Sequence, residues 1–218
     1  YSRFLNKIYP VRDNAQRSLT YFNVDGKEYA QSVGASLDLA LNFSFPLRIT
    51  GGVSYNQSRL FEYERNEEGT KEGGAIAPRD FEFSPRWMGV YSVSYDFGKK
   101  LTVDVTGDWK GKMLLPTQGE VELTDDSGAV IGKETDPRPE YSPAYTKMNL
   151  QLTYKLDKLQ IYGGIKNLLD YKPKYALVNT SDPFNDKADT FGGLQFDTEY
   201  NYTPQQGRTG FLGLRYSF

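Results

Sequence analysis

The sequence contains neither cysteine nor histidine among its 218 residues. The absence of cysteine excludes disulfides and thiolate metal sites. The absence of histidine removes the commonest acid–base group and the Ser-His-Asp arrangement, so we do not expect an enzyme. No run of about 18 apolar residues occurs, which excludes a transmembrane helix. The opening segment YSRFLNKIYP has no initiating Met and no apolar signal core, as in a mature chain or a piece of one.

Charge and ligand-binding motifs are also scarce. The net charge is -2, the pI is near 5.4 and no basic tract occurs, so nucleic acid is not an expected partner. The paired glycines at 73–74 and 192–193 lack the Lys and helix of a phosphate-binding loop. Asp182, Asp186 and Asp189 do not have the spacing of a calcium loop. We therefore predict neither a metal site nor a cofactor.

Aromatic residues and glycine are plentiful, and the apolar residues alternate with polar ones. The chain has 21 Gly, 17 Tyr and 13 Phe, which favours an all-β fold. Alternation with a period of two is the pattern of a strand with two unlike faces. Such strands are expected at residues 33–43, 47–56, 87–97, 101–110, 147–156, 159–165 and 209–218. With the shorter, poorly alternating segment 1–8, about eight strands are predicted.

The connections between these strands alternate between short and long. Short turns are expected at residues 45–46, 98–100 and 157–158, and long loops at about 10–27, 57–84, 113–144 and 170–207. In an up-and-down antiparallel sheet, this order places every short turn at one end and every long loop at the other. Outer-membrane barrels have the same arrangement, with short periplasmic turns and long extracellular loops.

Strand length and residue placement favour a membrane barrel over a soluble sandwich. The alternating runs reach ten residues or more, long enough to cross a bilayer at the usual tilt, whereas sandwich strands are about five or six residues long. Aromatic residues near the short turns are Phe43, Phe45, Tyr95, Phe97, Tyr154, Tyr216 and Phe218, and those toward the long loops are Tyr55, Trp87 and Trp109. The opposite face carries Asp38, Arg48, Asp96, Asp104, Asp108, Lys110, Lys147, Lys155, Lys166 and Arg215. The alternative is a soluble β domain whose polar face meets water.

Two C-terminal segments resemble a known family. GGIKNLLDYKP, a long loop and then QQGRTGFLGLRYSF are similar to the end of TonB-dependent outer-membrane receptors, with Leu169 where the family more usually has Phe. The N-terminal segments YSRFLNKI and GKEYAQSVGASLDL also resemble the family pattern. By this resemblance, Leu212, Leu214, Tyr216 and Phe218 carry the signal that the barrel-assembly machinery reads. For Asn167 and Asp170 we predict turn chemistry rather than a ligand role.

The resemblance implies a fold and a function. Residues 1–218 would be the C-terminal segment of a transmembrane β-barrel of about 22 strands, without the plug domain. The receptor would capture a siderophore, haem, cobalamin or a glycan and import it across the outer membrane of a Gram-negative bacterium. Its partners would be outer-membrane lipid, the N-terminal barrel and plug, the inner-membrane energy transducer and a surface lipoprotein.

Two other interpretations stay open at this point. A small self-closed barrel of eight strands, with a structural or adhesive role, would pair residues 1–8 with 208–218. A soluble carbohydrate-binding β domain would fold without detergent. A ligand site is expected where the long loops meet the lumen, because Arg and aromatic side chains suit anionic chelates and flat surfaces. The candidates are Tyr63, Arg65, Arg79, Phe81, Phe83, Arg86, Arg138, Tyr141, Tyr200 and Tyr202.

Overall fold

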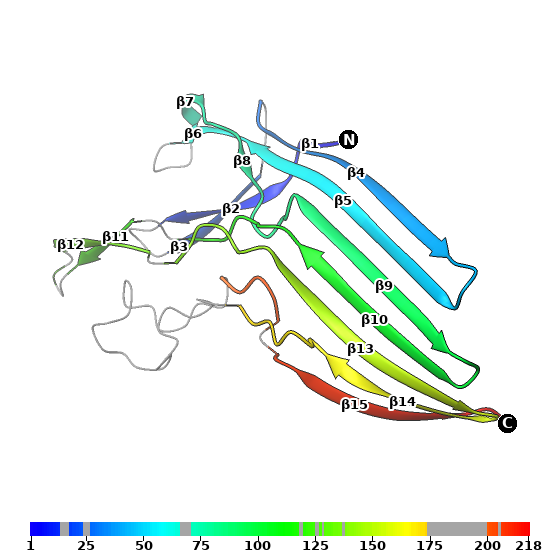
Figure 1. Ribbon diagram of the computed structural model, residues 1–218. Helices are drawn as coiled ribbons and strands as arrows, with labels where there is room; N and C mark the ends of the chain where they lie inside the picture. Colours follow the sequence, from blue (N-terminus) through cyan, green and yellow to red (C-terminus); the bar gives the residue numbers. More distant parts are fainter. Residues whose placement is uncertain are drawn as a thin grey trace.

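Eight long or edge strands form one antiparallel sheet in sequence order (Figure 1). The computed structural model describes residues 1–13, 18–23, 27–65, 71–117, 120–124, 127, 129–136, 138–173, 200–204 and 206–218. The strands are β1 (Ser2–Phe4), β4 (Tyr29–Asn42), β5 (Leu47–Phe61), β9 (Trp87–Phe97), β10 (Leu101–Lys110), β13 (Tyr145–Leu156), β14 (Leu159–Lys166) and β15 (Thr209–Tyr216). A two-residue strand, β8 (Arg79–Asp80), pairs with β5 beside this path.

The alternation read from the sequence fixes the register of the sheet. Leu37 of β4 lies opposite Val53 of β5, and Val103 of β10 lies opposite Leu152 of β13. Apolar residues therefore meet apolar residues on one face of these ladders. The predicted all-β, up-and-down antiparallel fold is confirmed. In the described part of the chain, no helix is long and apolar enough to span a membrane.

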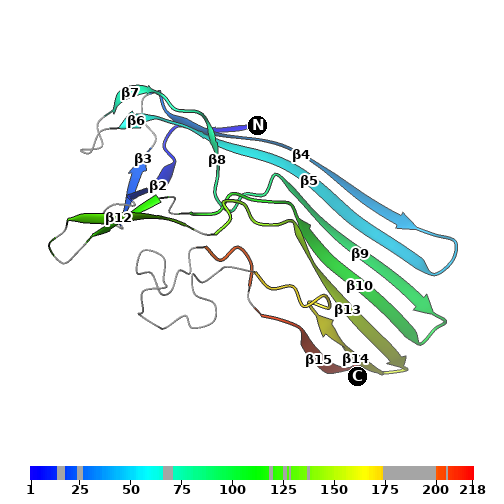
Figure 2. The ribbon, with the colours of Figure 1, turned by 60° about the vertical axis from the view of Figure 1, so that its left-hand side comes forward.

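The long-loop end carries three small hairpins that the sequence did not predict. They are β2 (Ile8–Asp13) with β3 (Ser18–Asn23), β6 (Tyr63–Arg65) with β7 (Lys71–Ala75), and β11 (Glu120–Thr124) with β12 (Val130–Thr135). All three stand at the end of the sheet opposite the short turns (Figures 1 and 2). Their strands are short, and mixed polar residues blur their alternation. The predicted limit of β5 at residue 56 is also wrong, because that strand continues to Phe61.

The apolar face of the sheet is not covered by a second layer among the described residues. Leu37, Leu152 and Leu214 are 68%, 47% and 67% exposed. Between the two sets of aromatic residues, the positions on this face of the eight-strand path carry no Asp, Glu, Lys or Arg. A sandwich would bury such a face against another sheet. The arrangement is that of a sheet whose apolar face meets lipid.

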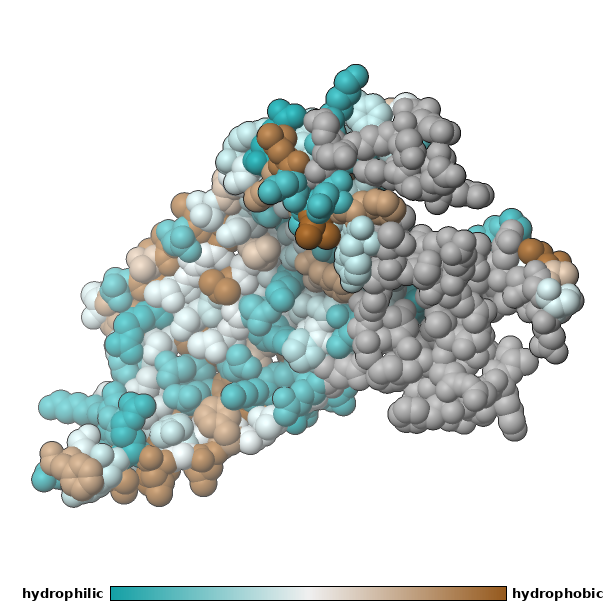
Figure 3. Space-filling model, turned by 180° about the vertical axis from the view of Figure 1, so that it is seen from behind, coloured by the Kyte–Doolittle hydropathy of each residue, from teal (hydrophilic) through white to brown (hydrophobic). Residues whose placement is uncertain are grey.

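The polar face is the other side of the same strands. Figure 3 shows hydrophilic and pale residues over most of the sheet seen from behind, with hydrophobic side chains projecting along its lower rim at β15. Arg48 of β5 and Asp96 of β9 form an ion pair of 3.3 Å on this face. Thr102 of β10 donates to the same carboxylate at 2.6 Å. Between the two sets of aromatic residues, the charged side chains of the sheet thus lie on the polar face.

Aromatic side chains form contacts at both ends of the apolar face. Near the short turns, the ring centroids of Phe43 and Phe45 are 5.1 Å apart, and those of Tyr216 and Phe218 are 5.3 Å apart. Toward the long loops, the rings of Tyr55 and Trp87 are 4.9 Å apart. Two aromatic rows therefore bound the apolar band, as they do at the two interfaces of membrane barrels.

The sheet is open. In the described residues β1 pairs with β4 and β15 pairs with β14, while no pairing joins β1 to β15. The self-closed eight-stranded barrel is therefore wrong for this structure, since it required residues 1–8 to pair with 208–218. An open sheet leaves unpaired backbone groups at both edges, which a lipid bilayer does not tolerate. The sheet therefore does not close into a barrel within the described residues.

Candidate functional site

The extended ends of β4 and β5 are covered by a small apolar core on the polar side of the sheet. Tyr9, Ala30 and Leu60 are buried there, with Phe22 and Phe81 packed against them. The core fixes β2 and β3 over the long-loop end of the sheet. Phe81, a predicted ligand residue, is therefore part of this packing.

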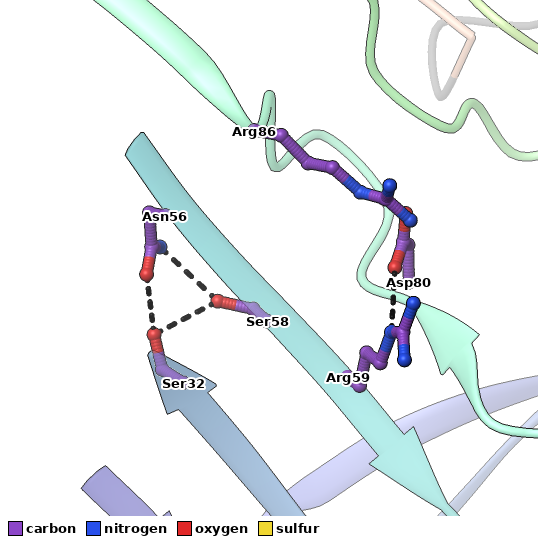
Figure 4. Close-up of polar contacts among 6 residues, drawn as sticks. All are labelled: Ser32, Asn56, Ser58, Arg59, Asp80 and Arg86. Atoms are coloured by element: carbon purple, nitrogen blue, oxygen red, sulfur yellow. Dashed lines mark hydrogen bonds and ion pairs between the residues drawn. The ribbon is translucent and has the colours of Figure 1, made fainter. Parts of the chain in front are cut away.

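Neighbouring predicted residues take part in polar contacts. The Arg79 Nε lies 3.6 Å from Glu62 Oε1, and the backbone N–H of Tyr63 donates to Glu28 Oε1 at 3.2 Å. Arg86 donates to Asp80 through Nε at 2.9 Å (Figure 4). The side chain of Arg65 lies outside the described residues.

A second core consists mainly of tyrosines from distant segments. Met113, Leu115, Tyr145, Tyr200 and Tyr202 are buried, and Tyr171 packs against them. The rings of Tyr145 and Tyr171 stack at 4.7 Å with an interplanar angle of 5°. The hydroxyls of Tyr171 and Tyr202 are 3.0 Å apart. Burial, helped by this hydrogen bond, raises the pKa of Tyr171 above its ordinary value.

A buried ion pair lies against this tyrosine core. Arg138 Nε donates to Asp136 Oδ1 at 2.9 Å and its NH2 donates to Oδ2 at 2.8 Å, with both side chains 1% exposed. The guanidinium carbon lies 4.4 Å from the centre of the Tyr200 ring. The Tyr200 hydroxyl donates to the carbonyl of Pro139. Arg138, Tyr200 and Tyr202 are thus buried, with Arg138 packed on the Tyr200 ring.

A hollow of about 690 Å³ opens beside the tyrosine core. Its walls combine aromatic, proline and charged side chains: Leu115, Pro139, Tyr141, Ser142, Pro143, Leu169, Asp170, Tyr171, Lys172, Tyr200 and Tyr202. Tyr141 is 40% exposed, and the Lys112 ammonium lies 5.3 Å from the centre of its ring. The Lys172 ammonium is 3.8 Å from Asp170. We call this feature the tyrosine hollow.

Leu114 links the two groups of predicted residues. It forms a parallel bridge with Glu82 and an antiparallel bridge with Tyr141. The backbone N–H of Phe83 also donates to the Leu114 carbonyl at 2.9 Å. Phe83 is 42% exposed and has a positive φ of 57°. The segments around Phe83 and Tyr141 therefore meet, although the predicted residues do not all gather at one site.

The turn after β14 is held by the side chains predicted for turn chemistry. Asn167 has φ of 49° and Asp170 has φ of 53°, in the left-handed region. The Asn167 amide donates to the carbonyls of Tyr171 and Gln206 at 2.8 and 3.2 Å. Asp170 Oδ1 accepts from the Arg208 N–H at 2.8 Å. The turn role predicted for Asn167 and Asp170 is confirmed.

The polar face has its own hollow of about 640 Å³ in mid-sheet. Its lining includes Asp38, Asp108 and Asn149, with Val90 as an exposed apolar residue among them. Nearer the long loops, Ser32, Asn56 and Ser58 form a ring of hydrogen bonds of 2.6 to 3.1 Å (Figure 4). This face therefore offers polar groups to whatever occupies the lumen.

Several residues of these features were not predicted. Lys172 and Tyr171 lie in a loop without periodicity. Only their contacts in the folded structure identify them as residues of the tyrosine hollow. Asp80 had no local signal either, and Arg59 lies beyond Gln57 and Ser58, where the alternating pattern of β5 ends. The discounted calcium residues Asp182, Asp186 and Asp189 lie outside the described residues.

Comparison with solved structures shows the fold. The chain resembles the ferric-catecholate import receptor Fiu of E. coli K12, with a TM-score of 0.56 and 15% identity over 99% of this chain and 24% of that one. It also resembles the ferric enterobactin receptor PfeA of Pseudomonas aeruginosa, with a TM-score of 0.52 and 18% identity over 99% of this chain and 28% of that one. The third structure is FpvA of P. aeruginosa, bound to a pyoverdine and iron. Its TM-score is 0.52 and its sequence identity is 15%, over 98% of this chain and 23% of that one. The chain thus spans about a quarter of each structure.

The sequence itself matches a family. No curated protein matches the chain. The family model described as "TonB dependent receptor-like, beta-barrel" matches residues 1–168 of the 218. This match, with the open sheet and its exposed apolar face, shows that the chain belongs to the TonB-dependent receptor β-barrel family.

Proposed function

We propose that the chain is the C-terminal segment of an outer-membrane receptor that captures a scarce nutrient and imports it with energy from the inner membrane. The observation that carries the proposal is the two-faced sheet. Its apolar face is exposed and free of charge between the two aromatic rows, while its polar face carries ion pairs and hydrogen-bonding side chains. A membrane barrel with a hydrated interior needs this division.

The proposal includes partners outside the chain. The remaining strands would close the barrel, and a plug within it would contact the energy transducer of the inner membrane. Leu212, Leu214 and Tyr216 face the lipid side of β15 and are exposed, as expected of an assembly signal together with Phe218. A surface lipoprotein would dock on the long-loop end.

The tyrosine hollow is the proposed place of ligand contact. Tyr141 offers an exposed ring, and Lys172, which lines the same hollow, offers a cation. Rings of this kind stack on flat or sugar-like ligands, and the ammonium attracts anionic groups. Siderophores, haem, cobalamin and glycans remain the candidate nutrients.

The test is nutrient uptake by a strain that lacks the gene and carries variants on a plasmid. Deletion should abolish growth on one of the four nutrient classes and binding of that labelled nutrient to whole cells. The double variant Y141A/K172A should weaken binding about tenfold or more, given two lost contacts. Y21A is the matched control, because Tyr21 is a 64% exposed tyrosine outside the hollow. Unchanged uptake after deletion would refute import, whereas equal binding by Y141A/K172A and Y21A would refute only the place of contact.

A further inference from the structure

The apolar face of β5 continues beyond the upper aromatic row and ends in an arginine. The ladder with β4 runs without a shift from Arg48 opposite Asn42 to Phe61 opposite Tyr29. Arg59 therefore faces the same side as Val53 and Tyr55. Arg59 lies four residues beyond Tyr55 of the upper aromatic row. This separation corresponds to about 13 Å along the strand and, at the usual strand tilt, to roughly 10 Å along the membrane normal. Arg59 thus lies outside the barrel wall, just above the hydrocarbon level.

Arg59 shares one carboxylate with a second arginine (Figure 4). Asp80 of β8 is directly opposite Arg59 in the ladder and so lies on the same face. Arg59 Nε is 3.5 Å from Asp80 Oδ1, while Arg86 NH2 is 2.6 Å from Oδ2. The side chains of Arg59 and Arg86 are 37% and 45% exposed, against 15% for Asp80. Two guanidinium groups and one carboxylate leave one excess positive charge.

A third arginine lies on the same face two strands away. Arg3 of β1 is opposite Gln31 of β4, which is itself opposite Arg59. The Arg3 guanidinium is 3.9 Å from the centre of the Tyr29 ring, and Tyr29 stacks on Phe61 at 4.4 Å. We call Arg3, Arg59 and Arg86 the arginine belt. Its members outnumber Asp80, the one carboxylate that contacts them in the described part of the chain.

We propose that the arginine belt binds the phosphate groups of a phosphorylated glycolipid in the outer leaflet of the outer membrane. The inference rests on the proposed membrane location, but not on nutrient import. Headgroups occupy the level just beyond the hydrocarbon core, where the belt lies. Guanidinium groups pair with phosphate through two parallel hydrogen bonds. Because the belt faces away from the lumen, the transported nutrient would not meet it.

The direct test is native mass spectrometry of the complete purified receptor with bisphosphorylated lipid A added in detergent. The wild-type receptor should retain the lipid, and the triple variant R3Q/R59Q/R86Q should bind it at least about tenfold more weakly, because each charge-assisted contact contributes about that factor. Arg48→Gln is the matched control, since Arg48 pairs with Asp96 on the polar face. It should bind lipid as the wild type does.

Two further arms separate lipid binding from a merely structural role of Asp80. Asp80→Asn removes the negative charge that pairs with Arg59 and Arg86, so it should tighten lipid binding. Lipid A without its phosphates should bind the wild type and the triple variant equally. Equal binding of phosphorylated lipid by wild type, triple variant and Asp80→Asn would overturn the proposal. So would the loss of a co-purifying protein, rather than lipid, from the triple variant. None of these measurements involves uptake. The lipid-binding result can therefore be interpreted even if the receptor does not import a nutrient.

Discussion

Asn167 and Tyr171 are joined by two reciprocal hydrogen bonds across the turn that follows β14. Asn167 Nδ2 donates to the Tyr171 carbonyl at 2.8 Å, and Asn167 Oδ1 accepts from the Tyr171 N–H at 2.9 Å. The backbone N–H of Asn167 also donates to Asn149 Oδ1 at 3.0 Å. Asn167 thus contacts β13 through its backbone and the start of the last long loop through its buried side chain.

The first prediction is that Asn167→Ala destabilises the receptor by about 4–5 kcal/mol. The substitution removes the amide hydrogen bonds, each contributing about 1 kcal/mol, and places Ala at a positive φ, which costs another 1–2 kcal/mol or so. Asn167→Gly should lose less, because glycine accepts that backbone conformation. The urea midpoint in lipid vesicles measures both. Equal losses in the two variants would show that the backbone conformation contributes nothing.

The second prediction concerns the ion pair of Arg138 and Asp136. Arg138→Ala leaves a carboxylate buried without its partner, which costs about 3–5 kcal/mol. Lys133→Ala is the control, because Lys133 and Glu120 form an ion pair whose side chains are 58% and 56% exposed. That pair should contribute about 0–1 kcal/mol. The urea midpoint of each variant measures the loss of stability. A small loss of stability in Arg138→Ala would mean that water reaches Asp136.

The strands could be predicted from the sequence because lipid imposes a strict rule on one face. Leu37, Val103 and Leu152 follow that rule at every second position, so the alternation carries both strand and register. The extension of β5 from residue 56 to Phe61 was not predicted. Gln57 and Ser58 end the apolar pattern, although the backbone ladder with β4 continues. Hydrogen bonding to β4 and packing of Leu60 against Tyr9 and Phe81, which come from distant segments, hold that part of the strand.

The candidate site could be predicted only in part. Loop position marked Arg138 and Tyr200 as residues for ligand contact, yet they are buried against each other. Their burial depends on Tyr145 and Tyr171, which come from separate segments, and no local pattern links such residues. Tyr141 was both predicted and exposed. The local signal of Asn167 sufficed because turn chemistry depends on neighbouring residues alone.

The third prediction concerns Gly213, which lies opposite Tyr162 on the polar face. A Cβ added at Gly213 would overlap the Tyr162 ring, and the three atoms nearest to it would all belong to that side chain. Gly213→Ala should therefore destabilise the receptor by about 1–3 kcal/mol through overpacking. The double variant G213A/Y162S should recover most of that loss, which a double-mutant cycle measures. Gly74→Ala is the control, because its Cβ would meet nothing within 4 Å in the described structure.

The fourth prediction is an alkaline loss of stability that depends on Tyr171. Its pKa is raised in the folded state by burial and by the hydrogen bond with Tyr202. The neutral phenol thus stabilises the fold fully below the ordinary pKa of about 10. That stabilisation is lost as pH rises through the folded value. Urea midpoints from pH 9 to 11 should fall more steeply for the wild type than for Tyr171→Phe, and parallel slopes would contradict the assignment.

The fifth prediction tests the assignment of the two faces with adjacent residues. Leu37 lies within the charge-free apolar band of β4, and Ser36 lies on the polar face. An arginine facing hydrocarbon near the membrane centre costs about 2–4 kcal/mol, whereas one in a hydrated lumen costs little. Leu37→Arg should therefore reduce the amount of folded receptor in the outer membrane, and Ser36→Arg should not. The heat-modifiable band on a gel reports folded barrel in both strains. Equal amounts would mean that Leu37 meets water or protein rather than lipid, and the membrane orientation of the whole sheet would then be wrong.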